Sequence, residues 1–155
     1  MDSRLVSPFL MWAIAFAGAG ALLLVAPEVR IFESGIFGIL LVLLALLNWL
    51  YFFLSALWKN HGAARSAAGV GKLVTTGIYS RVRHPIYFAD IVLAWGAFLY
   101  LPKLAVLLAV CWLTVVLVFW ARLEEGALER KFGEEYREYK RGVPMLVPRI
   151  QKAKF

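Results

Sequence analysis

The sequence predicts an all-α protein, a polytopic membrane helix bundle with about four transmembrane helices and a C-terminal, cytoplasmic, amphipathic helical tail. Of the 155 residues, 62% are hydrophobic and 17% are charged, where a soluble domain carries about 25% charged residues. The mean hydropathy of +0.74 and four long apolar runs point the same way. We expect one membrane domain, residues 1–155.

The four apolar runs give the expected spans, about 5–26, 36–58, 86–101 and 104–121. A spanning helix needs roughly 17–25 apolar residues, so the third run is short, and it also contains Asp90. The first run exceeds the roughly 7–15 apolar residues of a signal peptide, and we expect a retained helix there. Small residues at 15–21 suit close packing on a neighbouring helix. Pro102 and Lys103 separate the last two runs and predict a tight helical hairpin.

The distribution of Lys and Arg predicts the orientation. With four spans, the N-terminal leader, an interfacial loop at 59–85 and the tail at 122–155 share one side of the membrane. That side carries 15 of the 17 cationic residues. Because cations collect on the cytoplasmic side, we expect an integral, multi-pass protein with both termini in the cytoplasm. The same reasoning assigns the net charge of +7 to the lipid bilayer as partner and excludes nucleic acid.

The tail has a helical pattern that is too charged to span a membrane. An apolar stripe at Leu128, Phe132, Tyr136 and Tyr139 recurs at helical spacing. Gly133 is expected to divide the tail into two short helices, and the prolines at 144 and 148 predict an extended closing segment.

The first polar cluster lies where the third run begins. Pro85 suits the first turn of a helix, so Arg83 and His84 stand beside the free amides of a helix N-terminus, which attracts anions. Tyr79 and Tyr87 add aromatic faces that can stack on a base. An aromatic belt with snorkelling arginines explains the same residues equally well.

The second polar cluster is Glu124-Glu125, on the same side as the first. Adjacent carboxylates at the end of the fourth run would be unfavourable beside the negative end of a helix dipole. A cation should therefore compensate them: Arg83, Arg122 or part of a ligand. An anion site, acidic acceptors and aromatic walls together fit a zwitterionic, nucleotide-like cofactor such as S-adenosylmethionine, although a purely structural ion pair is the alternative. The sequence has no P-loop, no dinucleotide fingerprint and no metal-ligand spacing.

These motifs resemble the isoprenylcysteine carboxyl methyltransferase and phospholipid methyltransferase superfamily over about residues 73–148. The matching positions are Gly77, Tyr79, Arg83, His84, Pro85, Tyr87, Glu124, Glu125, Leu128, Phe132, Gly133, Tyr136, Tyr139, Val143 and Pro144. The resemblance implies an integral membrane enzyme that uses S-adenosylmethionine and releases S-adenosylhomocysteine.

The resemblance also implies roles for individual residues. Tyr79, His84, Pro85, Tyr87 and Glu125 would belong to the cofactor site, whereas Arg83 and Glu124 would orient or polarise the methyl acceptor. Ala89 replaces a glycine that is frequent in the family, and Asp90 follows it, about one turn from Tyr87 and on about the same helix face. Asp90 could bind a polar acceptor or pair with a cation.

The expected function is methyl transfer to a lipid or lipid-like acceptor, an isoprenylcysteine carboxylate or a phospholipid amine, at the cytoplasmic membrane face. The alternatives are methylation of a small hydrophobic thiol or amine, a membrane reductase, and a non-catalytic scaffold. The sequence leaves open the acceptor, the choice among O-, N- and S-methylation, and the oligomeric state.

Overall fold

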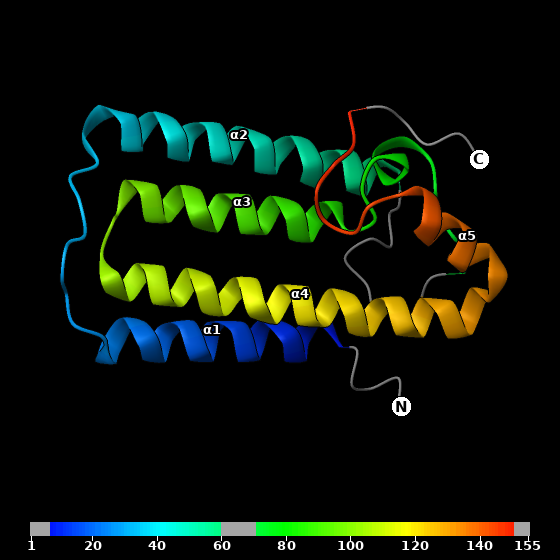
Figure 1. Ribbon diagram of the computed structural model, residues 1–155, viewed down its shortest axis with the longest axis horizontal. Coiled ribbons are helices and arrows are strands. Elements are labelled where there is room, and N and C mark those ends of the chain that lie inside the picture. The colour runs from blue at the N-terminus through cyan, green and yellow to red at the C-terminus, as the bar shows by residue number, and fades with distance from the viewer. Residues whose placement is uncertain (1–6, 60–70, 151–155) are drawn as a thin grey trace.

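A computed structural model describes residues 7–59 and 71–150 (Figure 1). Residues 60–70 of the expected loop at 59–85, together with both chain ends, lie outside this description. The helices are α1 (Pro8–Val25), α2 (Gly35–Lys59), the 3-10 turn η3 (Gly77–Ser80), α3 (Pro85–Tyr100), α4 (Leu104–Phe132) and α5 (Glu134–Gly142). The prediction of an all-α membrane bundle is confirmed.

The four long helices lie side by side in the order α2, α3, α4, α1 (Figure 1). Three of them, α1, α2 and α4, are long and apolar enough to cross a membrane, and α3 is a shorter apolar helix. With its 16 residues, α3 is about 24 Å long at 1.5 Å per residue, against about 30 Å for a bilayer core. α3 is therefore shorter than the hydrocarbon core of a bilayer.

Helix ends follow the expected sequence signals, with one difference. Proline occupies the first turn of both α1 and α3, where its missing amide hydrogen costs nothing. We expected the fourth helix to stop at residue 121 and the tail to begin a separate helix. Instead α4 continues without interruption to Phe132, because good helix formers follow Ala121. It stops at Gly133, whose φ of 58° suits glycine and separates α4 from α5 as predicted.

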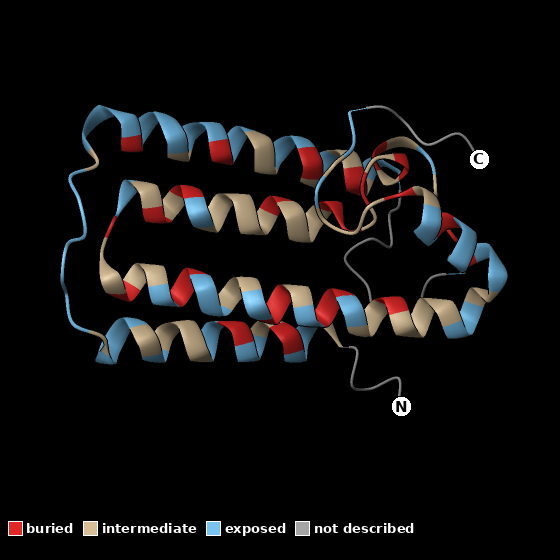
Figure 2. Ribbon diagram, in the orientation of Figure 1, coloured by how far each residue is buried: buried red, intermediate tan, exposed pale blue. Residues whose placement is uncertain are grey.

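The apolar surface of the bundle faces outward, as in a lipid-exposed protein (Figure 2). Exposed large side chains are spread along α1 and α2, and the buried positions lie where helices meet. Such a surface would be an aggregation hazard in water. In a bilayer it is the expected outer face of spanning helices.

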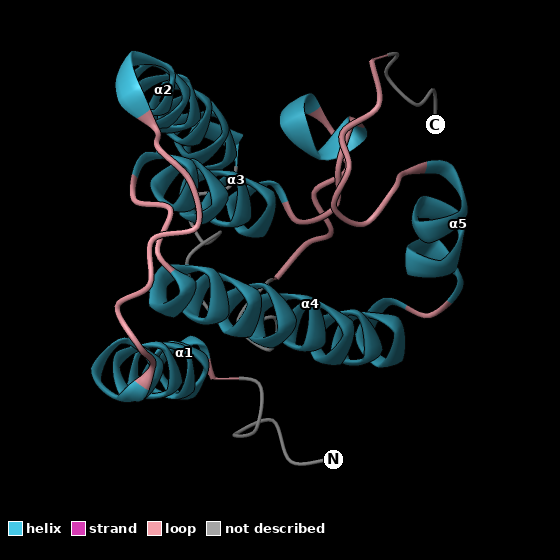
Figure 3. Cartoon of the chain, turned by 60° about the vertical axis from the view of Figure 1, so that its left-hand side comes forward, coloured by secondary structure: helices cyan, strands magenta, loops and turns pink. Residues whose placement is uncertain are grey.

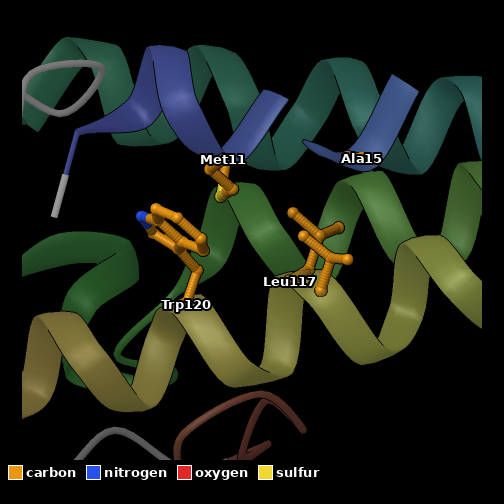
Figure 4. Packing of buried hydrophobic residues seen from close by; sticks show 5 residues of the cluster. Met11, Ala15, Leu117 and Trp120 are labelled. Atoms are coloured by element: carbon orange, nitrogen blue, oxygen red, sulfur yellow. The ribbon is translucent and has the colours of Figure 1, made fainter. Parts of the chain in front are cut away.

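Small side chains bring α1 and α4 together. Met11 and Ala15 of α1 are buried against Leu117 and Trp120 of α4 (Figure 4). One turn beyond Ala15, a Cβ atom placed on Gly18 would come within 2.1 Å of Trp112 Nε1. The Trp112 indole lies across Gly18 and donates a hydrogen bond to the carbonyl of Ile14 at 3.2 Å. Within the small-residue patch at 15–21, Ala15 and Gly18 thus pack against α4 as predicted.

We expect Gly18→Leu to destabilise this contact by about 1–3 kcal/mol, the usual cost of overpacking, because the Trp112 ring must move and give up its hydrogen bond. Gly20→Leu is the matched control, since a Cβ atom there meets nothing within 4 Å. Thermal unfolding in detergent should show a lower Tm for Gly18→Leu only. Equal losses in the two variants would contradict the packing described.

The two ends of the bundle differ in character. At one end, the segment after α1 pairs with the turn between α3 and α4: Ile31 N donates to Pro102 O at 2.7 Å, and Leu104 N to Val29 O at 2.8 Å. The opposite end holds the start of α1, the end of α2, η3 and α5 (Figures 1 and 3). The predicted polar clusters both lie at this second end.

Candidate functional site

Three segments that are far apart in sequence meet at the polar end of the bundle. They are the stretch from η3 into α3, the part of α4 beyond its apolar section at 104–121, and α5 with the residues that follow it (Figure 3). The first two segments carry the polar clusters predicted from the sequence. The third segment covers the first two.

An ion pair between Arg83 and Glu125 lies at the centre of the site. Arg83 Nε donates to Glu125 Oε1 at 2.7 Å, and Arg83 Nη2 is 2.6 Å from the same oxygen. Both side chains are more than nine-tenths buried. A single carboxylate facing a guanidinium in this way is held in one orientation, and Arg83 is the cation that compensates Glu125.

His84, Tyr87 and Glu124 form the adjoining half of the site. The Tyr87 hydroxyl donates to Glu124 Oε1 at 2.9 Å, and His84 Nδ1 is 3.7 Å from Glu124 Oε2. The rings of His84 and Tyr87 are parallel, with centroids 5.5 Å apart. Tyr87 thus reaches across from α3 to α4, and its ring stacks with the ring of His84.

The Glu pair is not at a helix end. We expected Glu124 and Glu125 to face the negative end of a helix dipole, but α4 continues past them to Phe132. The dipole effect falls off within the last turn, so it does not act on these two side chains. Burial and their cationic neighbours determine their charge instead.

The two carboxyl groups have opposite pKa shifts. Burial alone would raise the pKa of Glu125, but the contact with His84 and the charge and hydrogen bond of Arg83 lower it to about 2. Burial raises the pKa of Glu124 above its ordinary value, against the opposing effects of His84 and Tyr87. Neighbouring acids with separated pKa values are typical of sites that divide two chemical tasks.

The segment that follows α5 is hydrogen-bonded to the first polar cluster. Arg83 N donates to Pro144 O at 3.0 Å and His84 N to Met145 O at 3.1 Å. Arg83 Nη1 also donates to the carbonyls of Lys140 and Val143. The segment after α5 is not helical, as its prolines predicted, but it bends at residues 145–147 instead of running extended, and Arg83 joins it to Glu125.

Two tyrosines of α5 also hold this segment in place. Tyr136 and Tyr139 are buried with Leu73 and Val143, and the Tyr139 hydroxyl donates to the carbonyl of Tyr79 at 2.7 Å. The predicted apolar stripe of the tail is thus its packing face. The Tyr79 side chain packs with Phe52 of α2 and with Ile78 of η3.

Two polar residues of the site were not predicted from the sequence. Lys140 Nζ is 3.5 Å from Glu125 Oε2, and the buried hydroxyl of Tyr136 has no hydrogen-bond partner among the described residues. Lys140 is one of nine cations in the tail, and its spacing does not distinguish it from the others. Tyr136 was identified only as part of the apolar stripe.

Asp90 lies apart from the Glu pair. Trp49 Nε1 of α2 donates to Asp90 Oδ1 at 2.7 Å, whereas Tyr87 points to α4. The two side chains hydrogen-bond to different helices, although residues three apart on a helix differ in direction by only about 60°. Asp90 Oδ2 is buried without a hydrogen-bond partner in the described part of the chain.

Comparison with known proteins identifies the family. The profile described as phospholipid methyltransferase matches residues 34–135, from the start of α2 into α5. The chain belongs to the phospholipid methyltransferase family. The matched range includes both polar clusters, and methyltransferases of this family use S-adenosylmethionine.

Several curated relatives of this phospholipid methyltransferase family member are methyltransferases. It is 37% identical over 91 residues to methanethiol S-methyltransferase 1 of Bradyrhizobium diazoefficiens (57% of this chain, 30% of the relative). It is 31% identical over 118 residues to methanethiol S-methyltransferase of Pseudomonas deceptionensis (74% and 43%). It is also 31% identical over 101 residues to human protein-S-isoprenylcysteine O-methyltransferase (61% and 34%). The matched regions thus span less than half the length of these relatives, and no solved structure is significantly similar to the chain.

The residues of the site fit the family's cofactor. His84 Nε2 is buried and lies 3.5 Å from Glu125 Oε1, too far for a strong hydrogen bond, and the buried Tyr136 hydroxyl has no hydrogen-bond partner among the described residues. Buried polar atoms without partners are costly, and a ligand with several polar groups can satisfy them. An ionised Glu125 can accept hydrogen bonds from an ammonium or ribose hydroxyls, and the parallel rings of His84 and Tyr87 offer a face for an adenine or a sulfonium.

Proposed function

We propose that this chain catalyses methyl transfer from S-adenosylmethionine to a lipid or lipid-like acceptor at the cytoplasmic face of the membrane. The observation that carries the proposal is the buried cluster of Arg83, His84, Tyr87, Glu124 and Glu125, which lies within the family match at one end of an apolar bundle. A structural ion pair between Arg83 and Glu125 does not involve Glu124 or the Tyr136 hydroxyl, which is buried without a hydrogen-bond partner among the described residues.

On the cofactor side, we assign Glu125, His84, Tyr87, Pro85 and Tyr79. Glu125 would accept hydrogen bonds from the ammonium or the ribose. His84 would donate or accept one through Nε2, and Tyr87 would supply a ring face. Pro85 begins α3 and so fixes the backbone direction of this segment. Tyr79 would act through its carbonyl, which holds Tyr139 and with it the closing segment.

On the acceptor side, we assign Glu124 as the base. S-adenosylmethionine supplies an electrophilic methyl group. A thiol or amine acceptor must lose a proton to become a nucleophile, and Glu124 can take it, because a base is most effective when its pKa lies near the working pH. Oε1 of Glu124 already accepts from Tyr87, which leaves Oε2 for the proton. A carboxylate acceptor would need no such base.

Arg83 has a different position from the one that we expected. Its guanidinium is occupied by Glu125 and by two carbonyls of the tail, so we propose that it acts as a positioning residue through Glu125. It fixes the carboxylate and the closing segment together. Most of the rate enhancement would then come from orientation and from the exclusion of water.

The short α3 supports a lipid-like acceptor. Because α3 is shorter than the bilayer core, its polar N-terminal end would lie at the membrane boundary, where an acceptor in the bilayer could reach Glu124 laterally while the cofactor enters from the aqueous side. Asp90, with its unpaired Oδ2 between α2 and α3, would contact a donor group on such an acceptor.

A small hydrophobic thiol is the second candidate acceptor. It is favoured by the two relatives that are methanethiol S-methyltransferases. A thiol of this kind also requires the deprotonation that Glu124 can provide.

Methyl transfer from labelled S-adenosylmethionine separates these acceptors. Purified protein is incubated with a membrane lipid extract, with farnesylcysteine and with methanethiol in parallel. Label in a lipid or in farnesylcysteine supports the proposal, and label in methanethiol alone selects the second candidate. No transfer to any of the three, by protein that binds S-adenosylhomocysteine, would reject both acceptor classes.

A further inference from the structure

A cavity of about 440 Å³ lies outside the cluster described above, between the last turns of α2 and η3. Its size falls within the range of about 300–1,000 Å³ that small-molecule sites occupy. The residues that matter for the argument are Tyr51, Leu54, Ser55, Lys59, Gly77 and Arg81. None of them belongs to the proposed methyl-transfer machinery.

Two cations, Lys59 and Arg81, line this cavity. No acidic side chain of the described residues forms an ion pair with Lys59 or Arg81, although Arg83, two residues away, is paired with Glu125. The stem of Lys59 lies flat over Gly77, since a Cβ atom on that glycine would come within 2.7 Å of Lys59 Cγ. Gly77 also has a φ of 67°. Because Gly77 has no side chain, the Lys59 stem has room to lie over the cavity.

The opposite wall of the cavity is apolar and faces the lipid. Tyr51 and Leu54 are more than half exposed on the outer surface of α2, and Trp58 is 81% exposed. Aromatic side chains at the end of a spanning helix typically lie at the level of the lipid headgroups. The cavity therefore combines two cations, Lys59 and Arg81, with an apolar edge on the outer surface of α2.

We propose that this cavity binds an anionic phospholipid of the surrounding membrane, with the phosphate between Lys59 and Arg81 and the acyl chains along Tyr51 and Leu54. Two charged donors facing one phosphate make strong, charge-assisted hydrogen bonds. The Ser55 hydroxyl is placed to add a third donor. The lipid would be a bound, non-reacting component that holds η3 against α2, so the proposal does not depend on the methyl acceptor.

The test measures lipid binding by thermal stability in uncharged detergent micelles. Phosphatidylglycerol is titrated against the full chain, with phosphatidylcholine and inorganic phosphate in parallel. We expect a rise of Tm that saturates with phosphatidylglycerol, and weaker or no shifts with the other two. A shift of equal size with inorganic phosphate would mean a free-anion site and would overturn the lipid assignment.

Charge-neutral variants locate the site. In Lys59→Gln/Arg81→Gln the affinity for phosphatidylglycerol should fall on the order of 30-fold, which corresponds to about 1 kcal/mol for each membrane-facing cation. The matched control is Arg122→Gln/Arg130→Gln, which removes two exposed cations at the same end of the bundle. Equal losses in the two double variants would show that only net charge matters and would reject the cavity.

Two further measurements keep the result interpretable. S-adenosylhomocysteine should bind to Lys59→Gln/Arg81→Gln as to the wild type, which shows that the fold is intact. If that variant does not fold, Lys59→Glu at the exposed end of α2 replaces it, and this reversal should abolish the phosphatidylglycerol shift. A shift retained in Lys59→Glu would contradict the proposal.

Discussion

Replacing Arg83 by alanine is expected to lower the free energy of unfolding by about 3–5 kcal/mol, the cost of leaving one partner of a buried ion pair uncompensated. Among the described residues, Glu125 would keep Lys140 Nζ, at 3.5 Å, as a cationic neighbour and His84 Nε2, also at 3.5 Å, as a polar one. The closing segment would also lose the two carbonyl contacts of the guanidinium. Chemical denaturation in detergent, compared with Arg122→Ala, measures the effect.

The double variant Arg83→Ala/Glu125→Gln separates the charge from the packing. It leaves no unpaired carboxylate, so its loss of stability should be clearly smaller than the sum of the two single losses, as expected for residues in contact. Arg122 is exposed, and its replacement should change stability by no more than about 0.5 kcal/mol. Additive losses at Arg83 and Glu125, or equal losses at Arg83 and Arg122, would show that the ion pair is not central.

Glu124→Gln is expected to reduce kcat by about 10²–10⁴-fold with a thiol or amine acceptor, the usual contribution of a positioned base. Affinity for S-adenosylhomocysteine should change little, because the amide keeps the shape and can still accept from Tyr87. Glu129→Gln, a half-exposed carboxylate on the same helix, is the matched control. Loss of cofactor affinity equal to the loss of kcat would move Glu124 to the cofactor side.

The pH dependence gives a second test of the same role. The pKa of Glu124 is raised by burial, and the base acts in its deprotonated form. The rate should therefore fall as the pH drops through a pKa above the ordinary glutamate value, and Glu124→Gln should lack this fall. With a carboxylate acceptor, Glu124→Gln should cost little at any pH.

The sequence predicts much of the fold because helices in a membrane are determined by local signals. The apolar runs, Pro85 and Gly133 each mark a helix or its boundary, and the observed ends lie within a few residues of the expected ones for the first three spans. The end of α4 was wrong, because loss of hydropathy at Arg122 marks the end of the apolar section and not the end of helical hydrogen bonding.

The sequence predicts which residues make up the site but not which of them contact each other. Both polar clusters were predicted from charged residues at the ends of apolar runs. The sequence could not show, however, that Arg83 contacts Glu125 while Tyr87 contacts Glu124. That division depends on the rotation of α3 against α4, which is set by packing along the whole helix pair. The contact of Lys140 depends likewise on how α5 turns back after Gly133.

The central claim is that the cluster around Glu125 holds the cofactor, and titration of S-adenosylhomocysteine tests it most directly. We expect the wild type to show a Tm that rises with ligand concentration by mass action. Glu125→Gln should need at least about tenfold more ligand, since it removes a charged hydrogen-bond partner worth about 1.5–3 kcal/mol, whereas Glu129→Gln should match the wild type. No shift in folded wild-type protein at saturating ligand, or the same shift in Glu125→Gln as in the wild type, would contradict the account.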